Sequence, residues 1–123
     1  MPRLYDSHYF TEEECACNCG CGKMIVSDTL LRRLERARTN AGIPFKVTSW
    51  TRCKHHNEAS GAKGPEHTVG EAVDVEADDS LERFTIVSEG IKAGFTRIGI
   101  SKAGNFVHFG VSTDLPNPRL WLY

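Results

Sequence analysis

Apolar residues in the first half of the chain recur with the period of a helix and then with that of a strand. Ser27 can cap a helix whose apolar face carries Leu30, Leu31, Leu34 and Ala37. Gly42 and Pro44 follow, and residues of these types end helices. Residues 45–49 alternate between apolar and polar side chains and include β-branched types, so they predict a strand.

A second strand and helix follow after a polar stretch. Residues 50–66 are rich in Gly, Lys and His and predict a loop, while residues 1–26, rich in Cys and Gly, predict an irregular segment. The valines of residues 72–76 predict a strand. Ser80 can cap a helix with apolar residues at helical spacing, and Gly94 closes it.

Two further strand patterns and an apolar tail complete the chain. Residues 96–100 and 105–111 predict two strands, and Gly104 between them suits a tight hairpin. We expect the apolar tail at residues 115–123 to pack back on the body. Helices combined with short, hairpin-connected strands predict an α+β fold, with a small, mostly antiparallel sheet and flanking helices.

Length and composition favour one domain and exclude several partners. The chain has 123 residues, which we interpret as a single domain, 1–123, with the Cys-rich segment 1–26 packed on it. A formal net charge of −1 gives no electrostatic footprint for nucleic acid, and no apolar run reaches the roughly 18 residues that span a membrane. The start of the sequence lacks the pattern of a secretory signal, so we expect synthesis in the cytoplasm.

The five cysteines are distributed unevenly. Cys53 stands apart from a cluster of four that alternate with other residues, namely Cys15, Cys17, Cys19 and Cys21. Residues two apart in an extended segment hold their side chains in poor geometry for a disulfide. The thiols therefore bind a soft metal, or one of them bridges to Cys53, or they pack as reduced cysteines. We expect Cys53 to lie close to the cluster, because the two lie near opposite ends of one helix–strand unit.

Two polar residues interrupt apolar strands in the second half of the chain. Asp74 and His108 each stand between bulky apolar neighbours, which are Val73, Val75, Val107 and Phe109. Successive side chains of a strand point to opposite faces, so the apolar neighbours can enter a core while the Asp and the His face the other way. A carboxylate in a sheet is costly unless it is paired or bound to a metal.

A third residue completes a set of metal donors. His67 lies just before the strand that contains Asp74, and Gly70 between them allows a sharp turn. With His108, the set comprises two imidazoles and one carboxylate. Three protein groups of these types, with a fourth position for water, form an open catalytic zinc site.

The residues of this set also form a recognisable motif. It resembles the H-x-x-G-x-A-x-D signature of the zinc D-alanyl-D-alanine carboxypeptidase family, and the matching residues are His67, Gly70, Ala72 and Asp74. That family includes phage endolysin peptidases that cut the peptide stems of the bacterial cell wall, and the Hedgehog signalling domain shares its fold and zinc ligands. The resemblance covers residues 10–123, and its further matches are residues 47–52, Asn57, residues 94–100, residues 106–108, residues 121–123 and the alternating cysteines.

The resemblance implies a function and roles for individual residues. It implies a zinc peptidase acting on peptidoglycan stem peptides, as a D-Ala-D-Ala carboxypeptidase or an endopeptidase, and we expect a monomer. His67, Asp74 and His108 would be the Zn²⁺ ligands, and Arg52 would grip a carboxylate of the substrate, for which a planar guanidinium offers two parallel hydrogen bonds. The protein would reach the cell wall after release from the cytoplasm, or be carried on a phage particle.

The general base is where the sequence departs from its relatives. They carry an ionisable group three residues before or two residues after the third ligand, and those positions are Asn105 and Gly110 here. The other ionisable groups available are Glu66, Glu71, Asp114, His55 and His56. If none of them serves, we expect feeble activity that Gly110→Asp raises. The alternative is a non-catalytic, zinc-stabilised binding or virion-associated module.

Overall fold

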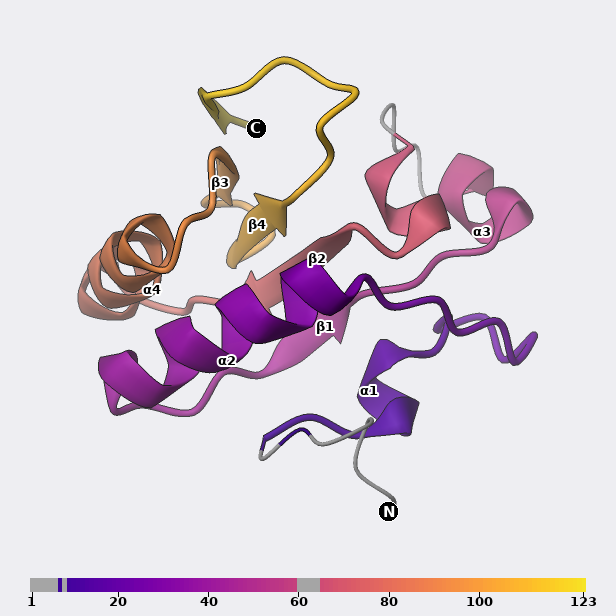
Figure 1. Ribbon diagram of the computed structural model, residues 1–123, viewed down its shortest axis with the longest axis horizontal. Coiled ribbons are helices and arrows are strands. Elements are labelled where there is room, and N and C mark those ends of the chain that lie inside the picture. The colour runs from indigo at the N-terminus through magenta and orange to yellow at the C-terminus, as the bar shows by residue number, and fades with distance from the viewer. Residues whose placement is uncertain (1–6, 8, 60–64) are drawn as a thin grey trace.

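The computed structural model describes residues 7, 9–59 and 65–123, and in this part of the chain five strands form one sheet (Figure 1). The strand order is β1-β2-β4-β3-β5. The strands are β1 Val47–Ser49, β2 Ala72–Glu76, β3 Arg97–Ser101, β4 Phe106–Gly110 and β5 Arg119–Leu122. Neighbouring strands are antiparallel except β3 and β5, which are parallel. The expected α+β class with a mostly antiparallel sheet is therefore confirmed.

Two long helices cover one face of the sheet. Helix α2, Asp28–Ala41, begins as expected, because the hydroxyl of Ser27 accepts a hydrogen bond from the backbone N–H of Leu30. Gly42 ends it. Helix α4, Ser80–Lys92, is capped one residue earlier than expected: the carboxylate of Asp79 accepts from the N–H of Glu82 at 2.8 Å, which makes Ser80 the first helical residue.

Three short helical segments lie where the sequence predicts irregular structure. Helix α1, Glu12–Cys15, is held by a capping box between Thr11 and Glu14. Helix α3, Lys54–Ala59, interrupts the predicted loop 50–66, and the 3₁₀ helix η1, Glu66–Val69, begins at its last residue. Each is too short to show a helical period in its apolar residues, so the pattern gave no signal.

The hairpin between β3 and β4 is present, but its turn differs from the expectation. Asn105 (φ 53°) adopts the left-handed conformation there, and Gly104 is covered by the ring of Phe106. Asn tolerates this conformation because its short side chain can hydrogen-bond locally. The apolar tail does pack back on the body, as strand β5.

The two faces of the sheet differ in kind. One face carries buried apolar side chains that pack with those of α2 and α4, among them Val73, Val75, Ile98, Val107 and Phe109. The register places a row of residues on the other face, across all five strands, in which polar or small side chains end at an aromatic one: Ser49, Asp74, His108, Gly99 and Trp121. The alternation of a strand thus delivers Asp74 and His108 to the face opposite the core.

Candidate metal centre

His67, Asp74 and His108 converge on the open face of the sheet. Asp74 in β2 and His108 in β4 are cross-strand neighbours, and His67 comes from η1. One donor atom from each lies within 4.8 Å of the donor atoms of the other two. All three residues are at most 5 % exposed. The spacing in the sequence therefore corresponds to a compact cluster that could hold a metal ion.

The turn between His67 and Asp74 depends on Gly70. Its φ of 69° lies in the left-handed region, and a Cβ at this position would overlap the backbone carbonyl of Ile25. The carbonyl of Gly70 also accepts a hydrogen bond from the N–H of Ser27, at 3.0 Å. This contact ties the end of η1, the element that carries His67, to the start of α2.

Hydrogen bonds fix which nitrogen of each histidine faces the centre. The Nδ1 of His67 lies 2.6 Å from the carbonyl oxygen of Trp50 and must donate to it, because a carbonyl only accepts. Its Nε2 faces Asp74, 3.4 Å from Oδ1. For His108 the roles are reversed: Nδ1 lies 3.0 Å from Oδ1 of Asp74, and Nε2 lies 3.0 Å from Oε1 of Glu66. The nitrogen atoms that face Asp74, and that a metal ion in this cluster would meet, are therefore Nε2 of His67 and Nδ1 of His108.

Glu66 supports His108 from the side opposite to Asp74. Its buried carboxylate also accepts hydrogen bonds from Arg97, whose Nε lies 3.1 Å from Oε2. A Cβ added at Gly110 would overlap this carboxylate, so Glu66 occupies the space beside Gly110. This changes the expectation for Gly110→Asp, because the new side chain would meet a carboxylate that is already there.

Five ionisable residues were candidates for the general base. Among the described residues, Glu66 is the candidate that forms a hydrogen bond with the cluster, through His108. Sequence reasoning missed its role as a partner of His108. The signal available was its place next to His67, together with the glycine at position 110. Burial and the charges on Asp114 and Glu66 raise the pKa of Glu71, which lies at the edge of this region.

Arg52 lies at the cluster, with its guanidinium already engaged. It donates to Asp74 Oδ2 at 3.3 Å, to Ser49 Oγ at 3.0 Å and to Asn57 Oδ1 at 3.5 Å. These contacts within the described residues use three of its five N–H groups, leaving one on each terminal nitrogen. Its backbone N–H donates to the carbonyl of His67 at 2.9 Å. Arg52 thus orients Asp74 and retains two donors, one on each terminal nitrogen.

The C-terminal strand brings aromatic residues to the same place. The ring of Trp121 lies over Gly99, where a Cβ would overlap it, and its centroid is 5.3 Å from that of His108. The guanidinium of Arg97 lies 5.1 Å from the Trp121 ring. Burial, with the charges on Asp74 and Glu66, raises the pKa of Tyr123, whose hydroxyl therefore remains a hydrogen-bond donor.

The electrostatics of the cluster favour a cation. Burial alone would raise the pKa of Asp74, but hydrogen bonds from His108 and His67 hold it well below its usual range. Burial alone would lower the pKa of His108, but hydrogen bonds to Asp74 and Glu66 raise it. The carboxylates thus stabilise positive charge between them. Two imidazoles and one carboxylate, with their outward atoms hydrogen-bonded, fit a Zn²⁺ ion.

Comparisons with known proteins identify a family. A family model described as Peptidase M15 matches residues 8–110, which include the whole His67, Asp74 and His108 cluster. The match ends before β5. No curated protein and no solved structure matched the chain. In the described residues no helix has the length and apolar character needed to cross a membrane.

Proposed function

The chain belongs to the Peptidase M15 family, and from this we propose that it is a zinc peptidase that hydrolyses the stem peptides of peptidoglycan. The observation that carries the proposal is the convergence of one donor atom each from His67, Asp74 and His108 within 4.8 Å. Family membership supports a metallopeptidase. Zinc as the metal, the three residues as its ligands and the cell wall as the substrate are our proposals.

Each proposed ligand has a partner that orients it. The carbonyl of Trp50 holds His67, Glu66 holds His108, and Arg52 holds Asp74. For the two histidines, such outer partners fix the tautomer and the direction of the ligand atom and raise its basicity, while Arg52 fixes the direction of the Asp74 carboxylate. When bound, zinc supplies a Lewis acid for the scissile carbonyl and lowers the pKa of water to about 7.

Hydrolysis requires that water adds to the carbonyl carbon, that the C–N bond breaks and that a proton reaches the leaving amine. We propose that Arg52 positions the peptide, with its two remaining N–H groups on a substrate carboxylate. In a carboxypeptidase that group is the terminal carboxylate of D-Ala-D-Ala; in an endopeptidase it is an acidic group within the stem. Glu66 acts as a positioning residue, because it contacts the nitrogen of His108 that points away from Asp74.

A second candidate is a non-catalytic, zinc-stabilised binding module, such as one carried on a phage particle. Asn105 and Gly110 offer no ionisable group beside His108. Both oxygens of Glu66 are also engaged, by His108 and Arg97. These observations favour a module that retains the metal and lacks hydrolysis.

Incubation of the zinc-loaded protein with purified muropeptides distinguishes the two candidates. Loss of a terminal D-Ala, detected by mass spectrometry, identifies a carboxypeptidase, and cleavage of cross-linked dimers identifies an endopeptidase. His108→Ala provides the control and should leave both substrates intact. Intact muropeptides after prolonged incubation with fully zinc-loaded wild-type protein would reject the peptidase and support the binding module.

A further inference from the structure

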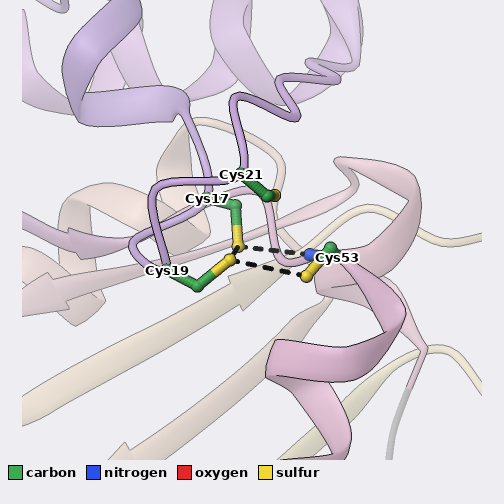
Figure 2. Close-up of side chains that lie close together, drawn as sticks. All are labelled: Cys17, Cys19, Cys21 and Cys53. Atoms are coloured by element: carbon green, nitrogen blue, oxygen red, sulfur yellow. Dashed lines mark hydrogen bonds between the residues drawn. The ribbon is translucent and has the colours of Figure 1, made fainter.

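A second group of potential ligands lies outside the sheet. Cys17, Cys19 and Cys21 from one loop face Cys53, which lies just before α3 (Figure 2). Their sulfur atoms all lie within 4.8 Å of one another. The Sγ atoms of Cys17 and Cys19 are 3.4 Å apart, and those of Cys19 and Cys53 are 3.6 Å apart.

These separations distinguish a metal site from a disulfide. A disulfide has an S–S length of about 2.05 Å. Four thiolates at about 2.3 Å from a tetrahedral zinc ion lie roughly 3.8 Å from one another. The separations of 3.4 and 3.6 Å are close to the second value, and all four cysteines are free thiols.

The backbone of the loop explains how alternating cysteines converge. Gly20 and Gly22 both have φ of +84°, so the chain turns after Cys19 and again after Cys21. The N–H of Cys17 donates to the carbonyl of Lys23 at 2.8 Å, which closes the loop. In an extended segment the same three thiols would be spread along one face.

Backbone N–H groups point at the sulfur atoms. The N–H of Cys53 lies 3.3 Å from Sγ of Cys17, and the N–H of His56 lies 3.3 Å from Sγ of Cys53. Donors of this kind stabilise a thiolate. The thiolate is the form that binds metal.

We propose that Cys17, Cys19, Cys21 and Cys53 together bind a zinc ion in a closed, structural site. Four thiolates fill a tetrahedral shell and leave no position for water, unlike the three-donor cluster on the sheet. Cys15 does not take part, because it is fully buried in the hydrophobic core and lies outside the group of four converging sulfur atoms.

The site joins the N-terminal loop to the segment that carries Arg52. The side-chain amide of Asn18 donates to the carbonyl of Thr48, and the N–H of Thr51 donates to the carbonyl of Cys15. A metal ion bound to Cys53 adds a further and stronger connection next to Arg52. The cysteine site therefore anchors the loop that approaches Asp74.

Metal analysis of the protein purified under reducing conditions tests this proposal. We expect two zinc equivalents per chain, and cobalt substitution should give the near-ultraviolet charge-transfer absorption of thiolate–Co²⁺ bonds. Cys21→Ser and Cys53→Ser should each lose one equivalent and most of that absorption. The matched control Cys15→Ser should keep both. His108→Ala should lose the other equivalent and keep the absorption, which separates this proposal from the proposed peptidase site.

The wild-type protein alone can reject the proposal, so poorly folding variants do not obscure the result. One zinc equivalent, no thiolate–Co²⁺ absorption and rapid alkylation of the four thiols in the native state would overturn it. A disulfide-linked peptide joining Cys53 to Cys19 in the freshly purified protein would overturn it as well.

Discussion

The two clusters of metal donors differ in what holds them together. On the sheet, Asp74 and His108 come from paired strands, and each side chain has a further hydrogen-bond partner. In the N-terminal region, three of the four cysteines come from one turn, and Cys19 and Cys21 are exposed. Cross-strand pairing and core packing order the first cluster whether or not a metal is bound.

In this chain the number of donor residues in a cluster differs with the scaffold that holds them: three lie on the sheet, and four lie at the N-terminal loop. The sheet cluster has three buried donors and a scaffold that can keep a fourth position open. The cysteine cluster has four donors, three of them on one loop outside the sheet, and we expect this loop to gain order from the metal. We therefore propose that the sheet cluster carries out peptide hydrolysis and that the cysteine cluster stabilises the fold.

The largest expected effect comes from removing a ligand on the sheet. His67→Ala or His108→Ala should each reduce hydrolysis of muropeptides to background and remove one zinc equivalent, because two donors cannot hold the ion against a chelator. The fold should persist, since the core lies on the opposite face of the sheet. Retention of a full equivalent by each single variant under chelator challenge would show that the ligands are misassigned.

The next effect concerns the carboxylate behind His108. Glu66→Gln should lower metal affinity or activity by about 10–100-fold, the usual cost of losing such a partner.

Gly110→Asp alone should also lower activity, because the space beside Gly110 holds the Glu66 carboxylate. In a Glu66→Ala background, Gly110→Asp should recover part of the loss. If the losses in kcat/KM of the two single variants add in the double variant, the side chains at positions 66 and 110 do not share the same space.

A smaller effect is expected at Arg52. Arg52→Lys should lower kcat/KM by about tenfold, since an ammonium group cannot reproduce a two-bond fork to a carboxylate. Amidation of the substrate carboxylate should remove most of the difference between wild type and variant. If the difference persists with the amidated substrate, Arg52 acts only through its contact with Asp74.

The smallest expected effect is a change in stability at the N-terminal loop that leaves the sheet cluster unaffected. Asn18→Ala removes the hydrogen bond to the carbonyl of Thr48 and should cost about 1 kcal/mol of unfolding free energy in metal-free protein. The zinc-loaded protein should lose less, because the cysteine site holds the loop independently, and hydrolysis should not change. Equal losses in denaturant titrations of both forms would argue that the metal does not order this loop.

Much of the sheet cluster could be predicted because strand alternation is a local property. Asp74 and His108 stand between apolar neighbours, and the structure places those neighbours in the core, as expected. The contact between Glu66 and His108 joins residues 42 positions apart and depends on the register of β2 and β4, which no local pattern encodes.

The N-terminal region was predicted less completely. The expectation that Cys53 lies close to the alternating cysteines is confirmed for Cys17, Cys19 and Cys21. Cys15 instead enters the core, because the capping box at Thr11 starts a helix that turns it inward. The sequence left the choice between metal, disulfide and free thiols open, and this choice depends on distances between sulfur atoms that only the folded chain provides.

An anomalous difference map at the zinc absorption edge, from crystals of protein purified under reducing conditions, tests the central claim most directly. The account predicts two peaks. One should lie among Nε2 of His67, the carboxylate of Asp74 and Nδ1 of His108, and the other among the sulfur atoms of Cys17, Cys19, Cys21 and Cys53. The absence of a peak at the sheet cluster, or a peak there bound to other residues, would contradict the proposed active site. A single peak at the sheet cluster would contradict the structural site.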